Sequence, residues 1–371
     1  MKLAYLSNSV IPSTSANSVH VMKMCQGLAS AKCDTSLYAH QGDDLESGNP
    51  YMYYGVDQTF KIRAAMIPSF PRGRYLAYAF WANFFMAFKR PQIAYGRDVF
   101  ACSIASRMGI KTMFELHTLP DRESKIWATL KSLMVRRNFL GLCVITQALA
   151  DSCVENLGFD RSKILVLPDG ADPCDSVPPK PINKPNVLNI GYIGSLFPGK
   201  GMEMISCLAA EIKDAHFHIV GGNPEQIEAW KLRLGENLDC VDFYGHIPHS
   251  ETCAYARACD LLVAPYGREV GHIGRGDISK YLSPLKLFEY MSAGKAILCS
   301  DLPVLREIMI DNENCLLAQP EDVGAWLSKI DSLRDPSLRK RLASEGNRVF
   351  LERYTWGARA RRLTSWIETS L

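Results

Sequence analysis

The chain has 371 residues, of which 47% are apolar and 22% charged, and its formal net charge at pH 7 is +3. This length exceeds one ordinary hydrophobic core and fits two domains, and so small a charge argues against a nucleic-acid partner. No run approaches the roughly 18–20 apolar residues of a membrane-spanning helix, and the N-terminus turns polar too soon for a signal peptide. We therefore expect a cytoplasmic protein whose twelve cysteines are buried free thiols.

Short apolar runs of β type alternate with helical stretches along both halves of the chain. This alternation predicts βαβ units, and therefore a parallel sheet, in each half. In the first half the runs lie at residues 3–7, 35–39, 92–95, 112–116, 142–146 and 164–167. In the second half they lie at residues 189–193, 216–220, 241–244, 261–264, 296–299 and 314–317.

Five prolines within residues 173–186 indicate a stiff extended linker between the halves. We predict a first domain at residues 1–175, a linker at 176–186, a second domain at 187–352 and a C-terminal helix within 353–371. That helix either caps the second domain or crosses back to the first. Arg359 falls on its apolar face, where the stem would have to snorkel.

The first strand-to-helix turn, residues 7–17, is rich in Ser, Thr and Asn, which are good N-cap residues. It lacks the GxGxxG pattern of dinucleotide-binding sites, so by itself it indicates an ordinary capped turn. Asn17 stands at its end, where a helix is expected to begin.

A second turn, residues 191–202, carries Gly194, Ser195 and Lys200 between a strand and a helix. A lysine beside glycines at a helix start can neutralise a diphosphate, although a solvated loop lysine explains the pattern equally well. The segment is not a Walker A motif, because Gly201 rather than Ser or Thr follows the lysine.

Two later strand ends also suit a ligand. Gly221 belongs to a glycine pair that allows close approach of the backbone. His246 and Ile247 follow the strand at 241–244 and could hold a nucleotide base against the backbone, although a histidine at such a turn is more often structural.

Residues 283–297, with the sequence SPLKLFEYMSAGKAI, carry the most informative pattern. Pro284 suits a first helical position, and the free N–H groups of that turn form a site for a phosphate. Lys286 adds a positive charge, and Glu289 can accept hydrogen bonds from the two hydroxyls of a ribose. The pattern predicts a seat for a nucleotide diphosphate; the alternative is an amphipathic helix with both charges facing water.

In chain order, these segments resemble the nucleotide-binding domain of glycosyltransferase family 4, the retaining enzymes with GT-B architecture. After the Lys200 loop come VGG (220–222), FYGHIP (243–248), ARACDLLVAP (256–265), SPLKLFEYM and SDLPVLREI (300–308). In the first half, residues 17–29 resemble the family's first helix, FELH (114–117) its active-site histidine segment and LPDGAD (167–172) its Asn-Gly-Val-Asp turn.

The resemblance implies an α/β GT-B fold, with two Rossmann-like, doubly wound parallel-sheet domains facing an interdomain cleft that holds the active site. The first domain would bind the acceptor and the second the nucleotide sugar. The catalytic residues it implies are His117, Lys200 and Lys286. The donor-binding residues it implies are Asn17, Gly194, Ser195, Gly221, His246, Ile247, Ser283, Pro284, Leu285 and Glu289.

Two positions depart from the family's pattern. Tyr281 stands where the first Glu of its E-x7-E pair would fall, so we expect backbone around residues 283–285 to contact the transferred sugar. Ser195 stands where the family's phosphate-clamping Arg would fall. We hypothesise that Lys286 supplies the missing cation, because a departing diphosphate needs positive charge near its β-phosphate.

The reaction implied by the resemblance moves a sugar from a nucleotide-diphosphate sugar to an acceptor hydroxyl with retention, in surface polysaccharide or glycoconjugate synthesis. UDP is favoured as the nucleotide, with GDP as the alternative. No cofactor or metal is expected, since no DxD motif in a fitting context and no His/Cys ligand cluster is visible. Two rival interpretations stay open: a GT-B sugar-nucleotide 2-epimerase, and a non-catalytic sugar-nucleotide-binding protein.

Two segments of the first half bear on the acceptor. Residues 72–90 are aromatic-rich with basic ends, and residues 125–137 alternate cationic and apolar groups. Such segments either pack on the sheet or lie on an anionic membrane. The second interpretation would place the protein peripherally at the inner face of a membrane, with a lipid-linked acceptor rather than a free glycan or a protein.

Overall fold

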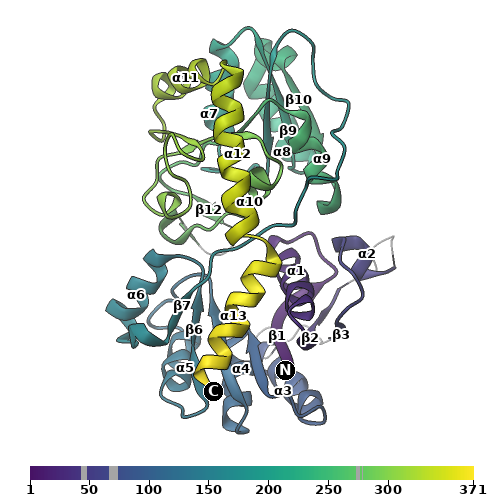
Figure 1. The fold of residues 1–371 in the computed structure, drawn as a ribbon, viewed down its shortest axis with the longest axis vertical. Helices are drawn as coiled ribbons and strands as arrows, with labels where there is room; N and C mark the ends of the chain where they lie inside the picture. Colours follow the sequence, from purple (N-terminus) through teal and green to yellow (C-terminus); the bar gives the residue numbers. More distant parts are fainter. Residues whose placement is uncertain (43–47, 67–73, 273–275, 278) are drawn as a thin grey trace. The chain divides into compact units, whose positions relative to one another are not determined.

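Two compact units make up the chain (Figure 1). The first comprises Met1–Asp169 together with Trp356–Leu371, and the second comprises Gly170–Thr355. The computed structural model describes residues 1–42, 48–66, 74–272, 276–277 and 279–371. The C-terminal residues therefore belong to the same unit as the N-terminus.

The proline-rich segment that was predicted as a linker, residues 176–186, belongs to the second unit. The Lys180 N–H donates a hydrogen bond to the Ala254 carbonyl (3.0 Å), so part of this segment is held against that unit. The structure divides the chain between Asp169 and Gly170, ahead of the prolines.

A seven-stranded parallel sheet forms the centre of the first unit, in the order β3-β2-β1-β4-β5-β6-β7. The order reverses between β1 and β4, as in doubly wound sheets, which bind ligands beyond the carboxyl ends of their strands. The strands are β1 (Lys2–Ile11), β2 (Asp34–Gln41), β3 (Lys61–Ala65), β4 (Ile93–Gly96), β5 (Lys111–Leu116), β6 (Phe139–Val144) and β7 (Ile164–Val166).

The C-terminal helix α13 packs against α1 of the first unit, and Figure 1 shows the yellow helix beside the purple one. A Cβ added to Gly27 of α1 would lie 2.6 Å from the carbonyl oxygen of Trp356, so only glycine permits this approach. The helices of this unit are α1 (Ala16–Ser30), α2 (Pro50–Tyr54), α3 (Arg74–Ala87), α4 (Val99–Arg107), α5 (Lys125–Met134), α6 (Gln147–Leu157) and α13 (Trp356–Ser370).

The second unit repeats the architecture with a six-stranded parallel sheet in the order β10-β9-β8-β11-β14-β15. Its strands are β8 (Leu188–Ile193), β9 (Ala215–Val220), β10 (Val241–Gly245), β11 (Leu261–Ala264), β14 (Ala296–Ser300) and β15 (Leu316–Ala318). A short antiparallel pair, β12 (Gly271–His272) and β13 (Gly276–Asp277), lies apart from it. Its helices are α7 (Met202–Glu211), α8 (Pro224–Leu234), α9 (Thr252–Ala258), α10 (Leu285–Ser292), α11 (Val323–Ser332) and α12 (Pro336–Arg353).

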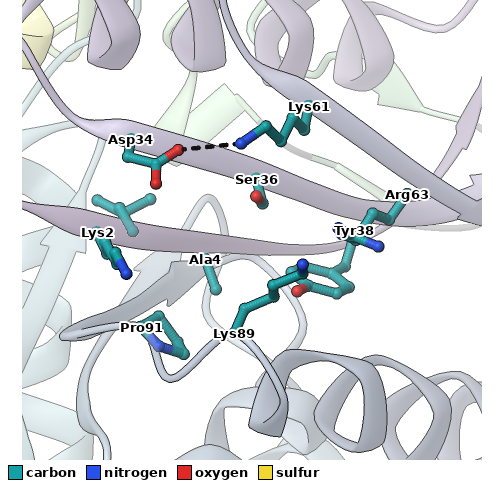
Figure 2. A pocket seen from close by; sticks show the side chains of 10 residues that line it. Lys2, Ala4, Asp34, Ser36, Tyr38, Lys61, Arg63, Lys89 and Pro91 are labelled. Carbon is teal, nitrogen blue, oxygen red and sulfur yellow. Dashed lines mark ion pairs between the residues drawn. The ribbon is translucent and has the colours of Figure 1, made fainter.

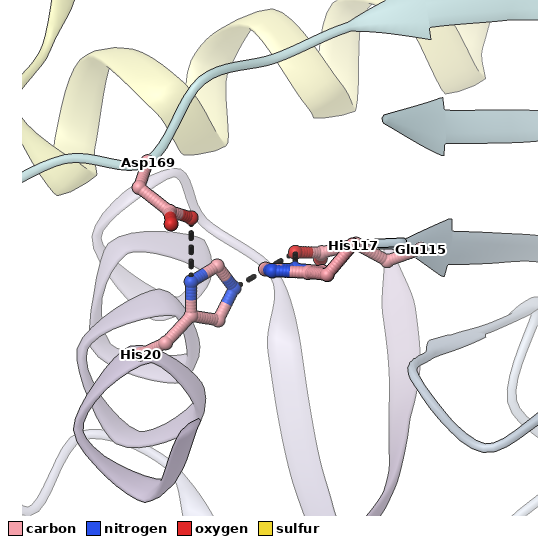
Figure 3. Close-up of side chains that lie close together, drawn as sticks. All are labelled: His20, Glu115, His117 and Asp169. Atoms are coloured by element: carbon pink, nitrogen blue, oxygen red, sulfur yellow. Dashed lines mark hydrogen bonds and ion pairs between the residues drawn. The ribbon is translucent and has the colours of Figure 1, made fainter. Parts of the chain in front are cut away.

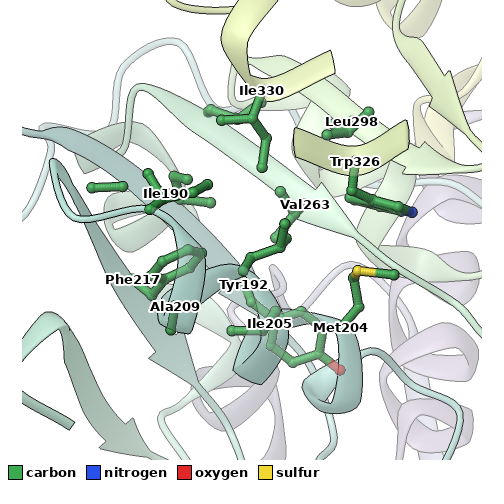
Figure 4. Packing of buried hydrophobic residues seen from close by; sticks show 14 of the residues in the cluster. Ile190, Tyr192, Met204, Ile205, Ala209, Phe217, Val263, Leu298, Trp326 and Ile330 are labelled. Carbon is green, nitrogen blue, oxygen red and sulfur yellow. The ribbon is translucent and has the colours of Figure 1, made fainter. Parts of the chain in front are cut away.

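The core of the second unit lies between its sheet and the helices α7 and α11 (Figure 4). Ile190 and Phe217 project from the strands, while Ile205 and Trp326 come from these helices, and all four are fully buried. Burying such side chains contributes about 1.5–3 kcal/mol each relative to exposure, so this core holds the strand ends that carry the site.

The expected parallel sheets are present in both halves, and β3 is an addition that the sequence pattern did not reveal. The expectation of buried free thiols is wrong for one pair, because Cys174 and Cys253 form a disulfide within the second unit. Eight of the other cysteines are buried free thiols. None of the helices among the described residues has the length and apolar character needed to cross a membrane.

Candidate functional site

Four titratable side chains gather at the carboxyl edge of the first sheet (Figure 3). His20 comes from α1, Glu115 from the end of β5 and His117 from the residues just after it, while Asp169 follows β7. This is the edge at which doubly wound sheets bind ligands. The fold thus places His117, predicted from FELH, within a polar group whose other members come from distant segments.

Contacts within this group form a continuous chain from Asp169 to His117. Asp169 Oδ1 lies 2.9 Å from His20 Nδ1, and His20 Nε2 lies 2.9 Å from Glu115 Oε1. His117 Nε2 contacts the same Glu115 oxygen at 2.6 Å. Each carboxylate is therefore tied to an imidazole, and each imidazole is oriented by a carboxylate.

Arg359 of α13 completes this network, since its Nη2 donates to Glu115 Oε1 at 3.0 Å. The Tyr95 hydroxyl donates to the other oxygen of Glu115. Burial alone would raise the pKa of Glu115, but the charges of Arg359 and His20 and a hydrogen bond from His117 hold it well below its usual range. The Arg359 stem was expected to snorkel; instead the whole side chain is buried and paired.

Burial, and then the charge of Arg97, lower the pKa of His117 to about 4. The imidazole is therefore neutral near pH 7 and carries one proton. Because Nε2 contacts an ionised carboxylate, Nε2 is the nitrogen that donates, and Nδ1 keeps its lone pair. His117 can thus accept a hydrogen bond through Nδ1.

Asn17 lies in the first turn of α1, one turn before His20. Its amide nitrogen donates to Ser9 Oγ at 2.7 Å, which joins the helix start to the end of β1. Asn17 and His117 therefore both lie on segments that follow the carboxyl ends of strands in the first sheet.

In the second unit, three strand ends meet at glycines. The Gly194 N–H donates to the Val220 carbonyl (2.9 Å), and the Gly221 N–H donates to the Gly245 carbonyl (2.7 Å). A Cβ on Gly221 would collide with the Gly194 carbonyl oxygen. The glycine pair was predicted to allow close approach of the backbone. In the structure, Gly221 allows the ends of neighbouring strands to approach one another.

Lys286 reaches this point from α10. Its ammonium lies so close to Gly194 that a Cβ there would come within 2.7 Å of Nζ. The ammonium sits over the Tyr192 ring at 3.9 Å from the centroid and over the Tyr266 ring at 4.9 Å. It is buried and has no hydrogen-bond partner among the described residues.

Burial, and then the nearby charge of Lys200, push the pKa of Lys286 well below its usual range, while Glu289 partly offsets them. Burial also lowers the pKa of Lys200. The two lysines predicted from separate motifs therefore act on each other electrostatically. Two neighbouring cations of this kind suit a ligand with more than one negative charge.

The helix α10 begins one residue later than predicted, at Leu285, and Pro284 is its N-cap residue. No side chain caps it, and the Leu287 N–H donates to the Pro284 carbonyl (3.1 Å), so the N–H groups of Leu285 and Lys286 are the ones that could meet an anion. Ser283, just before it, is buried. Glu289 lies one turn along the helix and contacts His249 Nε2 at 2.8 Å.

His249, which contacts Glu289, is not among the residues predicted from the sequence. His246 and Ile247 were the residues chosen from this segment, and the structure leaves the His246 side chain exposed and Ile247 half-buried. The histidine three positions further on is the one that meets Glu289. The only sequence signal was a second histidine in GHIPH, and spacing alone could not choose between the two.

Two groups of described residues have the spacing of metal ligands, although the sequence showed no cluster. They are His20, Glu115, His117 and Asp169 in the first unit, and His216, His218 and Asp242 in the second. In the first group, Arg359 already occupies the shared Glu115 oxygen. In the second, His218 Nδ1 contacts the Tyr244 hydroxyl and His218 Nε2 contacts Asn189 Oδ1. Lys184 Nζ lies 3.0 Å from Asp242 Oδ2. Both groups are thus bound into internal networks that a cation would have to break.

Two families match the chain, the first mainly within the first unit and the second within the second unit. Residues 18–174 match the family described as Glycosyltransferase Family 4, and residues 188–335 match Glycosyl transferases group 1. The chain belongs to glycosyltransferase family 4. Both matches are to sugar-transferring families, as the ordered motifs predicted.

Individual proteins to which this chain is similar are also named as sugar transferases. An uncharacterized glycosyltransferase of Methanocaldococcus jannaschii is 25% identical over 182 residues, 47% of this chain and 48% of that protein. A phosphatidyl-myo-inositol mannosyltransferase of Mycolicibacterium smegmatis is 26% identical over 178 residues, 46% of this chain and 42% of that protein. The matched region thus spans about half the length of these curated relatives.

The GT-B fold of this family 4 chain is shown by a solved structure that it resembles over its whole length. The crystal structure of Anabaena HepE in complex with UDP and glucose superposes with a TM-score of 0.70, at 16% identity and 100% coverage of both chains. Two Rossmann-like units built on parallel sheets of seven and six strands are therefore the GT-B architecture that the motifs implied.

Proposed function

We propose that this chain transfers a sugar from a nucleotide-diphosphate sugar to an acceptor hydroxyl, with retention of anomeric configuration. The observation that carries the proposal is the Lys286 ammonium, buried without a hydrogen-bond partner among the described residues, beside the uncapped start of α10. A buried cation of this kind costs free energy in the free protein. A diphosphate would supply the missing negative charge.

In the proposed reaction, the bond between the anomeric carbon and the β-phosphate oxygen breaks, and the acceptor oxygen bonds to the same carbon. The acceptor proton passes to the departing diphosphate. Lys286 and Lys200 stabilise the negative charge that develops on this leaving group. Electrostatic stabilisation of this kind is usually the largest single contribution to an enzyme's rate enhancement. Glu289 accepts hydrogen bonds from the donor ribose, and His117 contributes a hydrogen bond to the donor sugar.

We take the donor to be a UDP-sugar. The Anabaena HepE structure contains UDP and glucose, and this neighbour shares the fold of the whole chain. The acceptor would be a glycan, a lipid-linked glycan or a protein, in surface polysaccharide or glycoconjugate synthesis. One relative is named as a mannosyltransferase acting on phosphatidyl-myo-inositol, which favours a lipid-linked acceptor within that set.

No metal or other cofactor enters the proposed mechanism. In enzymes that use a cation on a diphosphate leaving group, the metal neutralises the developing charge. Here the paired lysines would provide that positive charge from the protein itself.

A thermal-shift panel of UDP-sugars and GDP-sugars, each with the free nucleotide as reference, tests donor binding. A ligand that binds only the folded state stabilises it by about 2.7 kcal/mol at a concentration of 100 Kd. We expect UDP-sugars to raise Tm more than GDP-sugars, and slow hydrolysis of the best donor to liberate the sugar with its original anomeric configuration. Tight binding with neither hydrolysis nor transfer to crude acceptor would instead identify a sugar-nucleotide-binding protein.

A further inference from the structure

The helix α3 presents an exposed row of large apolar side chains, defined as the aromatic stripe: Leu76, Phe80, Phe84 and Phe88. Spacing of four residues puts them on one side of the helix and its C-terminal turn. Phe80, Phe84 and Phe88 are 64%, 60% and 70% exposed. Phe84 and Phe88 pack on each other, with ring centroids 5.1 Å apart, rather than on the core.

The two segments noted as candidates for membrane contact behave differently. In α5 the apolar residues Leu130 and Leu133 are fully buried, whereas Ile126 of the same helix is 43% exposed, so this helix packs on the core with only part of its apolar surface. In α3 the opposite side, with Tyr78 and Met86, is buried, and the aromatic stripe is what remains outside. An exposed apolar surface of this kind usually marks a binding surface.

A cavity of about 220 Å³ opens beside this helix at the amino ends of β1, β2 and β3 (Figure 2). We call it the basic pocket, and its charged lining residues are Lys2, Lys61, Arg63, Lys89 and Asp34. Ser36 pairs with Lys61 and Tyr38 with Arg63 across β2 and β3, so Lys61 and Arg63 extend from one side of the sheet. Four cations thus face one carboxylate, which lies 3.7 Å from Lys61.

Two hydrogen-bond donors of the residues that line the basic pocket have no acceptor among the described residues. The Tyr38 hydroxyl and the Arg63 Nε are buried and have no partner among the described residues. Both residues line the cavity, and the Tyr38 side chain is 0% exposed. Buried donors without acceptors are rare, because an unpaired donor loses its hydration and gains nothing in return, and an anion that reached both would pair them.

The pocket and the aromatic stripe are neighbours. Lys89 directly follows Phe88, and the Trp81 ring of α3 lies 6.2 Å from the Tyr38 ring. The pocket lies at the amino ends of the strands, whereas His117 follows the carboxyl end of β5. It is therefore separate from the edge at which the first sheet carries its candidate site.

We propose that the aromatic stripe and the basic pocket together dock the first unit on an anionic phospholipid bilayer. The phenylalanines enter the boundary between headgroups and acyl chains, and the lysines and Arg63 bind headgroup phosphates. A second copy of the chain is the less favourable occupant, because a two-fold contact centred here would place one set of cations against the other. The inference goes beyond the proposed glycosyl transfer and does not depend on it.

Flotation of the purified full chain with vesicles tests the proposal. We expect binding to vesicles of phosphatidylcholine with phosphatidylglycerol, weakening as salt rises, and little binding to phosphatidylcholine alone. The variant Phe84→Ser/Phe88→Ser should bind at least about ten-fold more weakly. The variant Lys89→Gln should bind about five-fold more weakly, which is the effect of one basic side chain at an anionic surface.

Matched controls come from the second unit. Leu232 of α8 is 84% exposed and Lys340 of α12 is exposed, so Leu232→Ser and Lys340→Gln change similar side chains elsewhere and should bind like the unaltered chain. Equal binding to neutral and anionic vesicles would overturn the proposal. Unaltered vesicle binding by the Phe84→Ser/Phe88→Ser variant would also overturn it. If that variant bound vesicles normally but had a lower mass in sedimentation, the aromatic stripe would be a contact between two copies of the chain instead. The flotation experiment contains no nucleotide sugar, so its result does not depend on whether the chain has transferase activity.

Discussion

Arg359 of α13 and Glu115 of β5 form a buried ion pair across 244 positions of sequence, with Nη2 3.0 Å from Oε1. Their side chains are 1% and 0% exposed. The pair ties the C-terminal helix to an interior strand of the first sheet and sets the ionisation of the carboxylate that orients His117. It therefore couples the stability of the first unit to the geometry of its candidate site.

Replacing Arg359 by Met should lower the free energy of unfolding by about 3–5 kcal/mol, since it leaves Glu115 buried without its strongest cation. For a unit of this size, about 2–4 °C of Tm is lost per kcal/mol, so thermal unfolding would detect the change readily. Arg361→Met alters an exposed arginine of the same helix and should stay within about 0.5 kcal/mol of the unaltered chain. Equal effects of the two variants would show that the pair contributes nothing.

Much of the fold could be predicted because strands buried on both faces appear as apolar runs. Residues 189–193 and 261–264 were found this way and became β8 and β11. The strand β3 was missed, since KIRAA alternates charged and apolar residues at the edge of the sheet and presents no such run.

The candidate site was predictable only where it is local. Lys286 and Glu289 share one helix start, so their spacing already indicated a diphosphate and a ribose. The contacts of Glu115 with His20 and Arg359 join three distant segments, and neither periodicity nor spacing contains that information. His249 and the Lys286–Tyr192 contact were hidden for the same reason.

Acidification should destabilise the first unit through His117. Its pKa is about 4 in the folded chain and near 6.5 when unfolded, so the unfolded state binds more protons between these values. The free energy of unfolding therefore falls as pH falls from 6.5 toward 4, and this residue contributes about 2 kcal/mol of that loss by pH 5.

Urea unfolding at pH 7 and pH 5 measures the His117 effect. His117→Asn cannot take up the proton, so this variant should lose about 2 kcal/mol less stability than the unaltered chain over the interval. His246 is exposed, and His246→Asn should retain the full pH dependence. An identical loss in all three proteins would mean that His117 titrates normally.

Glu289 should report on the donor ribose. We expect Glu289→Gln to weaken binding of UDP by about ten-fold or more, because hydrogen bonds to a charged carboxylate contribute about 1.5–3 kcal/mol. In the unaltered chain, 2′-deoxy-UDP should bind more weakly than UDP, and the variant should discriminate less between them. Isothermal titration of both nucleotides gives the ratio.

The exposed Glu313 provides the control for Glu289, and Glu313→Gln should leave the UDP to 2′-deoxy-UDP ratio unchanged. If Glu289→Gln keeps the full preference for the ribonucleotide, the carboxylate contacts some other part of the ligand. The contact between Glu289 and His249 would then be purely structural.

Lys286 should matter far more for turnover than Ser195, which occupies the position of the family's phosphate-clamping Arg. Lys286→Met removes a positive charge aimed at the leaving group and should reduce kcat by about 100-fold or more, as loss of one electrostatic contact to a transition state does. Ser195 is exposed, and Ser195→Ala should cost far less. Steady-state transfer or donor hydrolysis measures both.

The Tm of the Lys286→Met variant shows whether a loss of turnover comes from the missing charge or from misfolding. The Lys286 ammonium is buried without a hydrogen-bond partner among the described residues, so Lys286→Met should leave the Tm of the free chain unchanged or raise it. The same variant should lose most of the Tm increase that UDP gives the unaltered chain, whereas Lys280→Met, at an exposed lysine, should keep it. Small and equal effects of Lys286→Met and Ser195→Ala on turnover would contradict the hypothesis that Lys286 replaces the missing arginine, because a cation needed by the leaving group cannot be removed without slowing its departure.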